Sequence, residues 1–380
     1  MFSFVSPQAI HFGRGQSKKT TEWAATFGSS VLVVHGANVA RAQWLIDGCY
    51  AAGLTVATVG CANEPCLPKV EDALRQLKGV TPDVVIGVGG GSVLDFAKAL
   101  AALIPCEGDP MAYLELVGDG CPLDRDPLPM IALPTTAGTG AEVTKNAVIL
   151  VPDHGIKVSL RDSRMVPNIA IVDPALMQGA PRQVALAAAL DAVTQVIEPY
   201  LSIKANPMTD ALSRAAISTG LNALKDLVEN DSPDAWDSMA WVSTCGGLAL
   251  ANAGLGAMHG FAGVIGGETN APHGAICGAL LPAVLESHLS KVENHTQTYV
   301  RLNWILDQID TCFANGQSGA GIAELRRWSR AMGLSGLEGL GLSVADHPRI
   351  AKAASKASSM RGNPFVLSQN ELLEILYAAR

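Results

Sequence analysis

The chain has 380 residues, of which 48% are hydrophobic and 16% are charged, and its formal net charge is −8. This composition excludes a disordered chain and predicts a globular protein with one large or two ordinary domains. The acidic balance and the lack of any basic run argue against a nucleic-acid partner, because phosphate binding needs a basic face.

Targeting and membrane signals are weak along the chain. Residues 1–15 lack the basic start and apolar core of a signal peptide, and the eight cysteines form no C-x-x-C pair, which is typical of free thiols in a reducing compartment. Residues 239–267 carry almost no charge but are rich in Gly, Ala, Ser and Asn. We expect them to form a buried helix followed by a functional turn, not a membrane span. The expected location is therefore the cytoplasm, with no membrane partner.

The first half of the chain alternates β-rich runs with helical runs. Two runs, 148–151 and 157–160, flank a Pro-Asp-His-Gly turn and predict a hairpin. Alternation of strands and helices with short connections predicts a parallel sheet covered by helices. The predicted strands of this sheet are 31–35, 54–59, 83–88, 130–133 and 169–172, with helices at 38–52 and 69–77.

The second half reads differently, because strand signals end at Arg182. Long Ala- and Leu-rich helical stretches follow, at 183–200, 207–229 and 235–253, and shorter ones continue to Arg380. The predicted fold class is an α/β N-terminal domain with a parallel sheet, residues 1–180, and an all-α C-terminal domain, residues 181–380.

A glycine loop directly follows the strand predicted at 83–88. It consists of Gly89, Gly90, Gly91 and Ser92, and a helix is expected to begin near Val93. Glycines let backbone N–H groups approach a phosphate, and a helix N-terminus adds free donors. Ser92 is expected to cap this helix and donate to a ligand oxygen. A tight turn without a ligand is the alternative.

A second loop of small residues follows the strand at 130–133. Thr135, Thr136 and Thr139 lie there among glycines, just past a strand's carboxyl end, where open α/β sheets bind ligands. Together the two loops are suited to the pyrophosphate and nicotinamide half of a dinucleotide.

Four polar residues in the second half suit a divalent cation. Asp191 and Gln195 lie four apart on a predicted helix and so face the same way. His259 and His273 follow in surroundings almost free of charge, each in front of a glycine. This set fits a metal with an open position. Hydrogen-bonded core histidines are the alternative.

These motifs resemble those of the iron-containing (group III) alcohol dehydrogenases, which have a dehydroquinate synthase-like fold. Residues 89–98 are similar to the family's GGGS-x-x-D-x-A-K stretch, and residues 134–144 nearly match its PTTAGTGSEVT stretch. The resemblance implies an NAD(P)-dependent, metal-assisted alcohol dehydrogenase or carbonyl reductase for a small alcohol or aldehyde. It assigns the dinucleotide to residues 1–180 and the metal and substrate to residues 181–380, and it implies a homodimer, which the apolar-rich composition also favours.

The resemblance also implies a set of site residues. The metal, Fe(II) or Zn(II), is expected at Asp191, Gln195, His259 and His273, with both histidines counted as catalytic. Asp95 and Lys157 are expected near the nicotinamide, as catalytic residues and, for Lys157, as a cofactor contact. Two positions depart from the family pattern: Gln195 stands where a histidine is usual, and Gly263 replaces a further histidine that assists proton transfer.

The choice of cofactor is predicted from the end of the strand at 31–35. NAD-using members of the family commonly have an aspartate there, whereas this chain has His35, Gly36, Ala37 and Asn38, followed by Arg41. Without a carboxylate to repel the 2′-phosphate, we expect NADP(H) to be accepted at least as well as NAD(H), with Gly36 and Asn38 contacting the cofactor.

Two other functions remain open: an oxo-acid reductase like the maleylacetate reductases, which does not require metal, and a dinucleotide-binding protein without catalysis.

Overall fold

A computed structural model describes residues 1–269 and 271–380. The described chain divides into two compact units. The α/β unit comprises Val5–Thr136 and Gly140–Gln178, and the helical unit comprises Met1–Phe4, Ala137–Thr139 and Gly179–Arg380. Residues 137–139 therefore belong to the helical unit, although the sequence suggested the N-terminal domain. Their backbone packs closely there, since a Cβ atom on Gly138 would lie 3.1 Å from the Cα of Ala188.

The α/β unit is built on a six-stranded parallel sheet with the strand order β1-β8-β5-β4-β2-β3. The five predicted strands are confirmed, whereas β1 was missed, because a four-residue edge strand carries too short a pattern to detect. The strands are β1 (Ala9–Phe12), β2 (Ser30–Gly36), β3 (Thr55–Cys61), β4 (Val84–Gly89), β5 (Met130–Pro134) and β8 (Ile169–Val172).

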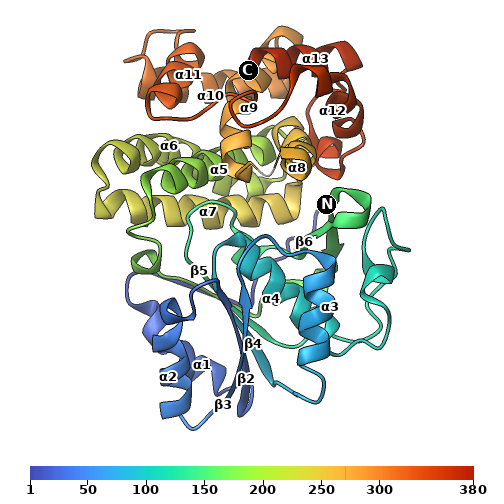
Figure 1. Cartoon of the computed structure of the whole chain (residues 1–380). Helices are drawn as coiled ribbons and strands as arrows, with labels where there is room; N and C mark the ends of the chain where they lie inside the picture. The colour runs from blue at the N-terminus through green and yellow to red at the C-terminus, as the bar shows by residue number, and fades with distance from the viewer. Residues whose placement is uncertain (270) are drawn as a thin grey trace. The chain divides into compact units, whose positions relative to one another are not determined.

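Helices cover both faces of this sheet (Figure 1). Alternate residues of β2 point to opposite faces, so Leu32 and Val34 pack under α3 (Leu67–Gln76) and α4 (Gly91–Leu103). Val31 and Val33 pack on the other side, under α1 (Thr20–Ala24) and α2 (Gln43–Ala51). The helix that follows β2, α2, lies on one face of the sheet, and the helix that follows β4, α4, lies on the other. Strands β2 and β4 are neighbours in the sheet. Their carboxyl ends therefore flank the switch point at which open α/β sheets bind ligands.

The predicted hairpin is also present. Strands β6 (Asn146–Val151) and β7 (Ile156–Arg161) pair antiparallel as a separate two-stranded sheet. Gly155 closes the turn with φ +61°, a left-handed conformation that glycine adopts without strain.

The helical unit is organised around two largely buried helices, α5 and α9, which Figure 1 labels among the other helices of this unit. Helix α5 packs against α6, α7 and α9, and α9 in turn packs against α8, α11 and α13. The predicted helices of this half are confirmed. The helices are α5 (Arg182–Leu201), α6 (Pro207–Asn230), α7 (Pro233–Ala253), α8 (Ala257–Thr269), α9 (His273–Lys291), α10 (Gln297–Phe313), α11 (Gly321–Ala331), α12 (His347–Ala354) and α13 (Gln369–Ala378).

The weakly charged stretch at 239–267 forms two helices rather than a helix and a turn. Helices α7 and α8 meet at a bend of 100°. By length and composition alone, α5 and the bent pair α7–α8 are long and apolar enough to cross a membrane. The apolar part of α5 is 83% buried inside the helical unit, as is typical of a core helix.

Two polar side chains, Asn206 and Asp173, cap helical segments. The side chain of Asn206 accepts hydrogen bonds from the N–H groups of Met208 and Thr209 and begins α6 in a capping box. Asp173 accepts from the N–H and the hydroxyl of Ser17 at 3.0 Å and 2.7 Å and from the N–H of Ala175 at 3.1 Å. Both side chains therefore have a structural role, and their oxygen atoms are occupied by these capping hydrogen bonds.

Candidate functional site

The glycine loop lies at the carboxyl end of β4, directly before α4. Gly89 allows the strand and the helix to approach, since a Cβ atom there would lie 2.5 Å from the Cβ of Val93. The helix begins at Gly91 with Gly90 as its N-cap and no side-chain cap. The expected capping role of Ser92 is therefore wrong, because this residue already lies inside the first turn, where its backbone is helical.

The threonine loop adjoins the glycine loop within the α/β unit. The N–H of Thr135 donates to the carbonyl oxygen of Gly89 at 2.9 Å, and a Cβ atom on Gly90 would lie 3.2 Å from the Cγ2 of Thr136. Both loops thus share one edge of the sheet, beside a free helix N-terminus. This arrangement suits a dinucleotide pyrophosphate. Thr139, the third expected contact, belongs to the helical unit.

Asp95 and Lys157 both have partners inside the α/β unit. Asp95 accepts a hydrogen bond from the N–H of Val148 at 3.0 Å and pairs with Lys98 at 2.9 Å. Lys98 is 1% exposed and donates to the hydroxyl of Thr144 at 2.8 Å, so the two sequence motifs are bonded to each other. Lys157 forms an ion pair with Glu64. These contacts give both residues a structural role, and their catalytic role stays a prediction.

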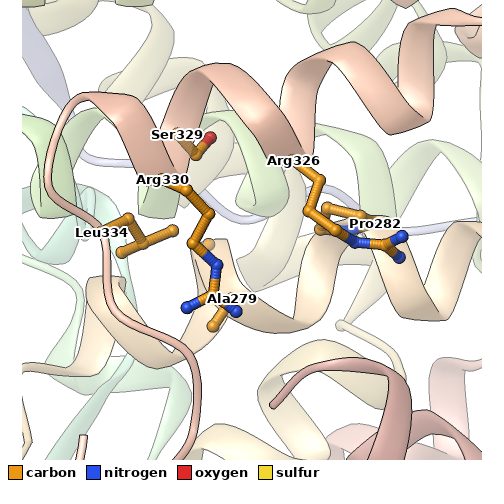
Figure 2. Close-up of a pocket in the computed structure, with 7 residues that line it drawn as sticks. Ala279, Pro282, Arg326, Ser329, Arg330 and Leu334 are labelled. Carbon is orange, nitrogen blue, oxygen red and sulfur yellow. The ribbon is translucent and has the colours of Figure 1, made fainter. Parts of the chain in front are cut away.

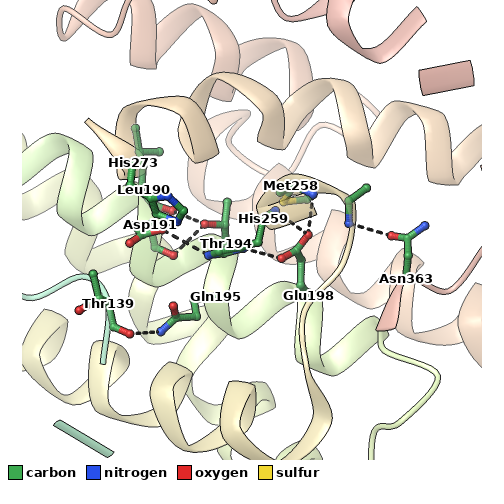
Figure 3. A network of polar contacts seen from close by, with 11 residues as sticks. Thr139, Leu190, Asp191, Thr194, Gln195, Glu198, Met258, His259, His273 and Asn363 are labelled. Carbon is green, nitrogen blue, oxygen red and sulfur yellow. Dashed lines mark hydrogen bonds and ion pairs between the residues drawn. The ribbon is translucent and has the colours of Figure 1, made fainter. Parts of the chain in front are cut away.

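A cluster of potential metal ligands lies in the helical unit (Figure 3). Asp191 of α5, His259 of α8 and His273 and Cys277 of α9 each offer one ligand atom, and these four atoms lie within 4.8 Å of one another. Spacing on the sequence suggested the first three residues. Cys277 was missed, although it lies four residues after His273 and so on the same helix face.

The geometry of this cluster fits a divalent cation. The Oδ1 atom of Asp191 and the Nε2 atom of His259 are buried and, among the described residues, have no hydrogen-bond partner. They lie 3.5 Å apart, and Asp191 Oδ1 lies 3.8 Å from His273 Nε2. Metal–ligand bonds of ~2.0–2.3 Å in a tetrahedron place ligand atoms roughly 3.3–3.8 Å apart. The separations are therefore long for hydrogen bonds but right for atoms that share a metal.

Glu198 supports this cluster and was also missed from the sequence. One carboxylate oxygen lies 2.6 Å from His259 Nδ1, and the other accepts from the N–H of Met258 at 2.7 Å (Figure 3). The carboxylate thus stabilises the N-terminus of α8 and fixes the His259 ring with Nε2 turned to Asp191. The signal was present, because Glu198 follows Asp191 by seven residues, about two turns later on the same Ala-rich helix.

The amide nitrogen of Gln195 is bonded to the backbone of Thr139, and its role as a metal ligand stays a prediction. Its Nε2 atom donates to the carbonyl oxygen of Thr139 at 2.7 Å, as Figure 3 shows. A Cβ atom on Gly246 would lie 3.2 Å from the same nitrogen, so this glycine leaves room for the amide. Gln195 is therefore tied to the backbone of the threonine loop.

The glycines after the two histidines serve helix packing. His259 lies within α8, and His273 is the first residue of α9. A Cβ atom on Gly274 would lie 2.1 Å from the carbonyl oxygen of Ala187, so only glycine lets α9 approach α5 this closely. This approach brings His273 to Asp191.

The charges in the cluster shift its pKa values strongly. Burial alone would raise the pKa of Asp191, but His273 and His259 outweigh it and lower that pKa below its ordinary value. Burial would lower the pKa of the imidazoles, yet Cys277 and Asp191 raise the pKa of His273 to about 9. The pKa of His259 is raised well above its ordinary value, with Cys277 and Glu198 as the main charges that oppose burial. The directions of these shifts agree in favouring positive charge at this point, as is expected where a cation binds.

Gly263 stands in open space. It lies one turn after His259 on α8, and a Cβ atom there would have none of the described atoms within 4 Å. The space for a side chain exists, but the imidazole that the family pattern has at this position is missing.

A small pocket elsewhere in the helical unit is separate from the cluster. Figure 2 shows it between α9 and α11. By the 3.6-residue period its α9 residues lie on roughly the opposite face of that helix from His273. Both arginines that line it have partners, Glu286 and the backbone oxygen of Arg380. It is lined by Gly278, Ala279, Pro282, Arg326, Ser329, Arg330 and Leu334.

One further histidine, His288 of α9, is predicted to make stability pH-dependent. It is 2% exposed, and burial, with a smaller contribution from Lys291 and against the attraction of Glu198, lowers its pKa to about 4. The unfolded chain, with a histidine pKa of ~6.5, binds the proton first, so stability present above pH 6.5 falls as the pH drops toward 4. This one group is expected to remove about 2 kcal/mol between pH 7 and pH 5. Urea titrations should show a smaller loss in His288→Phe, and an equal loss would contradict the assignment.

The comparisons with known proteins agree on one family. Residues 7–174 match the family model described as iron-containing alcohol dehydrogenase, and residues 185–380 match that of the Fe-containing alcohol dehydrogenase family, C-terminal. The two models together span nearly the whole chain.

Individual relatives are similar over most of their length. The probable alcohol dehydrogenase EutG of Escherichia coli (strain K12) is 34% identical over 319 residues, which cover 84% of this chain and 78% of that protein. The NAD-dependent methanol dehydrogenase of Bacillus methanolicus is 28% identical over 384 residues and 99% of each chain. The crystal structure of a 1,3-propanediol oxidoreductase has a TM-score of 0.88, with 28% identity and 100% of both chains covered.

Proposed function

We propose a function from one premise: the chain belongs to the iron-containing alcohol dehydrogenase family. It is accordingly an oxidoreductase that acts on the CH–OH group of an alcohol or, in reverse, on the carbonyl of an aldehyde. The family works with a nicotinamide cofactor and with iron or another divalent metal. The substrate we propose is a small alcohol or aldehyde.

The observation that carries this proposal is the cluster around Asp191. We propose that Asp191, His259 and His273 hold a divalent cation, Fe(II) or Zn(II). The facing atoms of Asp191 and His259 are buried without hydrogen-bond partners among the described residues, and both lie with His273 Nε2 at the spacing of metal ligands. When bound, such a metal acts as a Lewis acid on the substrate oxygen. Glu198 orients His259 and keeps its Nε2 atom available, while Gln195 holds the threonine loop.

The dinucleotide would be held by the α/β unit. Gly89–Ser92 and the N-terminus of α4 offer backbone N–H groups to the pyrophosphate, and Thr135 and Thr136 offer hydroxyls beside them. The protein's part in hydride transfer is then to position the nicotinamide and the substrate carbon. The proton of the alcohol must leave by a route other than residue 263, which has no side chain.

The decisive experiment is a screen for oxidation of small alcohols. The metal-depleted protein is reconstituted with Fe(II) or Zn(II) and tested with NAD and with NADP on a series of short alcohols and diols. We expect turnover that depends on added metal. Turnover that is equal with and without metal, on oxo acids only, would favour the oxo-acid reductase function. No turnover with intact dinucleotide binding would favour the non-catalytic one.

We also predict that NADP(H) is accepted at least as well as NAD(H). Gly36 ends β2 without a carboxylate, and Asn38 and Arg41 are exposed just beyond it. A Cβ atom on Gly36 would have its nearest neighbour at 4.0 Å, so the matched variant Gly36→Asp fits and should lower kcat/KM for NADP(H) about tenfold, or about 1.4 kcal/mol. The test is the ratio of kcat/KM for the two cofactors. A preference of the unaltered protein for NAD(H) above about tenfold would contradict the prediction.

We further propose that the protein is a cytoplasmic homodimer. The family resemblance and the low share of charged residues support the dimer, and cysteines that remain free thiols, as is typical of a reducing compartment, support the location. Sedimentation that shows only monomer at micromolar concentration would contradict the dimer, and fractionation of the source cells tests the location.

A further inference from the structure

Cys277 is the one member of the cluster around Asp191 that neither the sequence patterns nor the family pattern quoted above assigns. It is fully buried, and its sulfur lies within 4.8 Å of the facing atoms of Asp191, His259 and His273. It comes four residues after His273 on α9, so one face of one helix presents an imidazole and a thiol to the same point. Because it is buried, the thiol is shielded from solvent, and it lies beside the polar groups of the cluster.

The usual fourth ligand is missing from this chain. The family pattern has a histidine where Gln195 stands, and the Gln195 amide donates to the Thr139 carbonyl at 2.7 Å. A neutral amide is in any case a poorer ligand than an imidazole. Three ligands remain from the family pattern, while Asp191 Oδ1 and His259 Nε2 are buried without hydrogen-bond partners among the described residues. Unpaired buried atoms of this kind are costly unless an ion satisfies them.

We infer that Cys277 is the fourth protein ligand of the metal, as a thiolate that takes the place of the missing imidazole. This inference rests on the proposed function, since it concerns the same metal. Asp191 and Cys277 then supply two negative charges, which balance a divalent cation in a buried site. A thiolate is a soft ligand, and mixed sulfur and nitrogen sets favour Zn(II) over Fe(II). Zinc sites also expand from four to five ligands, so the set leaves room for a substrate.

The test uses Co(II) as a coloured probe in the metal-depleted full chain. A Co(II)–thiolate bond gives a charge-transfer absorption in the near ultraviolet, whereas oxygen and nitrogen ligands do not. We expect this band in the unaltered protein at one equivalent of Co(II), and its loss in Cys277→Ser and Cys277→Ala. The matched control is Cys49→Ser, because Cys49 is also fully buried but lies on α2 in the α/β unit, and it should keep the band.

Affinity gives a second measurement. Cys277→Ser should lower Zn(II) affinity at least about 100-fold in a chelator competition, since even residues that only orient ligands cost about 10- to 100-fold. Adding Gln195→His to Cys277→Ser should restore tight binding without the charge-transfer band.

The two proposals fail in different ways. Bound Co(II) without the band in the unaltered protein, which needs no variant to fold, would overturn the role of Cys277 and leave the metal site standing. Unchanged Zn(II) affinity in Cys277→Ser would overturn it as well. No binding of Co(II) or Zn(II) by the unaltered protein would overturn the metal-assisted function itself.

Discussion

Replacing His273 with alanine is expected to remove both the metal and alcohol oxidation. His273 lies 3.8 Å from Asp191 Oδ1 and presents its Nε2 atom to the cluster from the first turn of α9. A bound metal contributes several kcal/mol of transition-state stabilisation, so kcat/KM should fall about 1,000-fold or more. Elemental analysis measures the loss of metal. Steady-state turnover with the best alcohol from the screen measures the loss of alcohol oxidation.

The control for this variant is a histidine outside the cluster. His154 is exposed in the turn of the β6–β7 hairpin, so His154→Ala should keep both metal and turnover. Metal loss with unchanged turnover in His273→Ala would end the metal-assisted mechanism and favour the oxo-acid reductase function instead.

Loss of Glu198 is expected to have the second largest effect, although this residue does not touch the proposed metal. Its carboxylate lies 2.6 Å from His259 Nδ1 and accepts the N–H of Met258 at 2.7 Å. Without it the His259 ring loses the partner that sets its tautomer and orientation. Glu198→Ala should therefore lower metal affinity and kcat/KM about 10- to 100-fold, measured by chelator competition and steady-state kinetics.

Two further variants distinguish a positioning role of Glu198 from a role in stability alone. Glu198→Gln keeps the shape and an acceptor oxygen but loses the charge, so it should recover part of the metal affinity that Glu198→Ala loses. Glu286→Ala removes a carboxylate of α9 that pairs with Arg326 away from the cluster, and its metal affinity should match the unaltered protein. If Glu198→Ala lowers only thermal stability and leaves metal affinity unchanged, the positioning role is wrong.

The sequence by itself determined the features that depend on local periodicity and on short motifs. Alternation of apolar runs and helical stretches predicted the parallel sheet and the helical second half, since these patterns follow from periods of 2.0 and 3.6 residues. The strand before Gly89 and the helix after it identified the glycine loop. Asp191, His259 and His273 were chosen because carboxylate and imidazole are rare in apolar, nearly charge-free segments unless they have a partner.

Only the tertiary structure decided which of those groups meet. Gln195 shares a helix face with Asp191, yet its amide bonds to Thr139 from a distant loop, a contact that no local pattern encodes. Cys277 and Glu198 were visible as residues, but their roles depend on α5, α8 and α9 packing closely, which a glycine at 274 permits. Local spacing fixes the face on which a side chain lies, whereas contacts between segments far apart in the chain are set by packing. For this reason the sequence indicated a metal site, whereas helix packing determined which residues lie together in it.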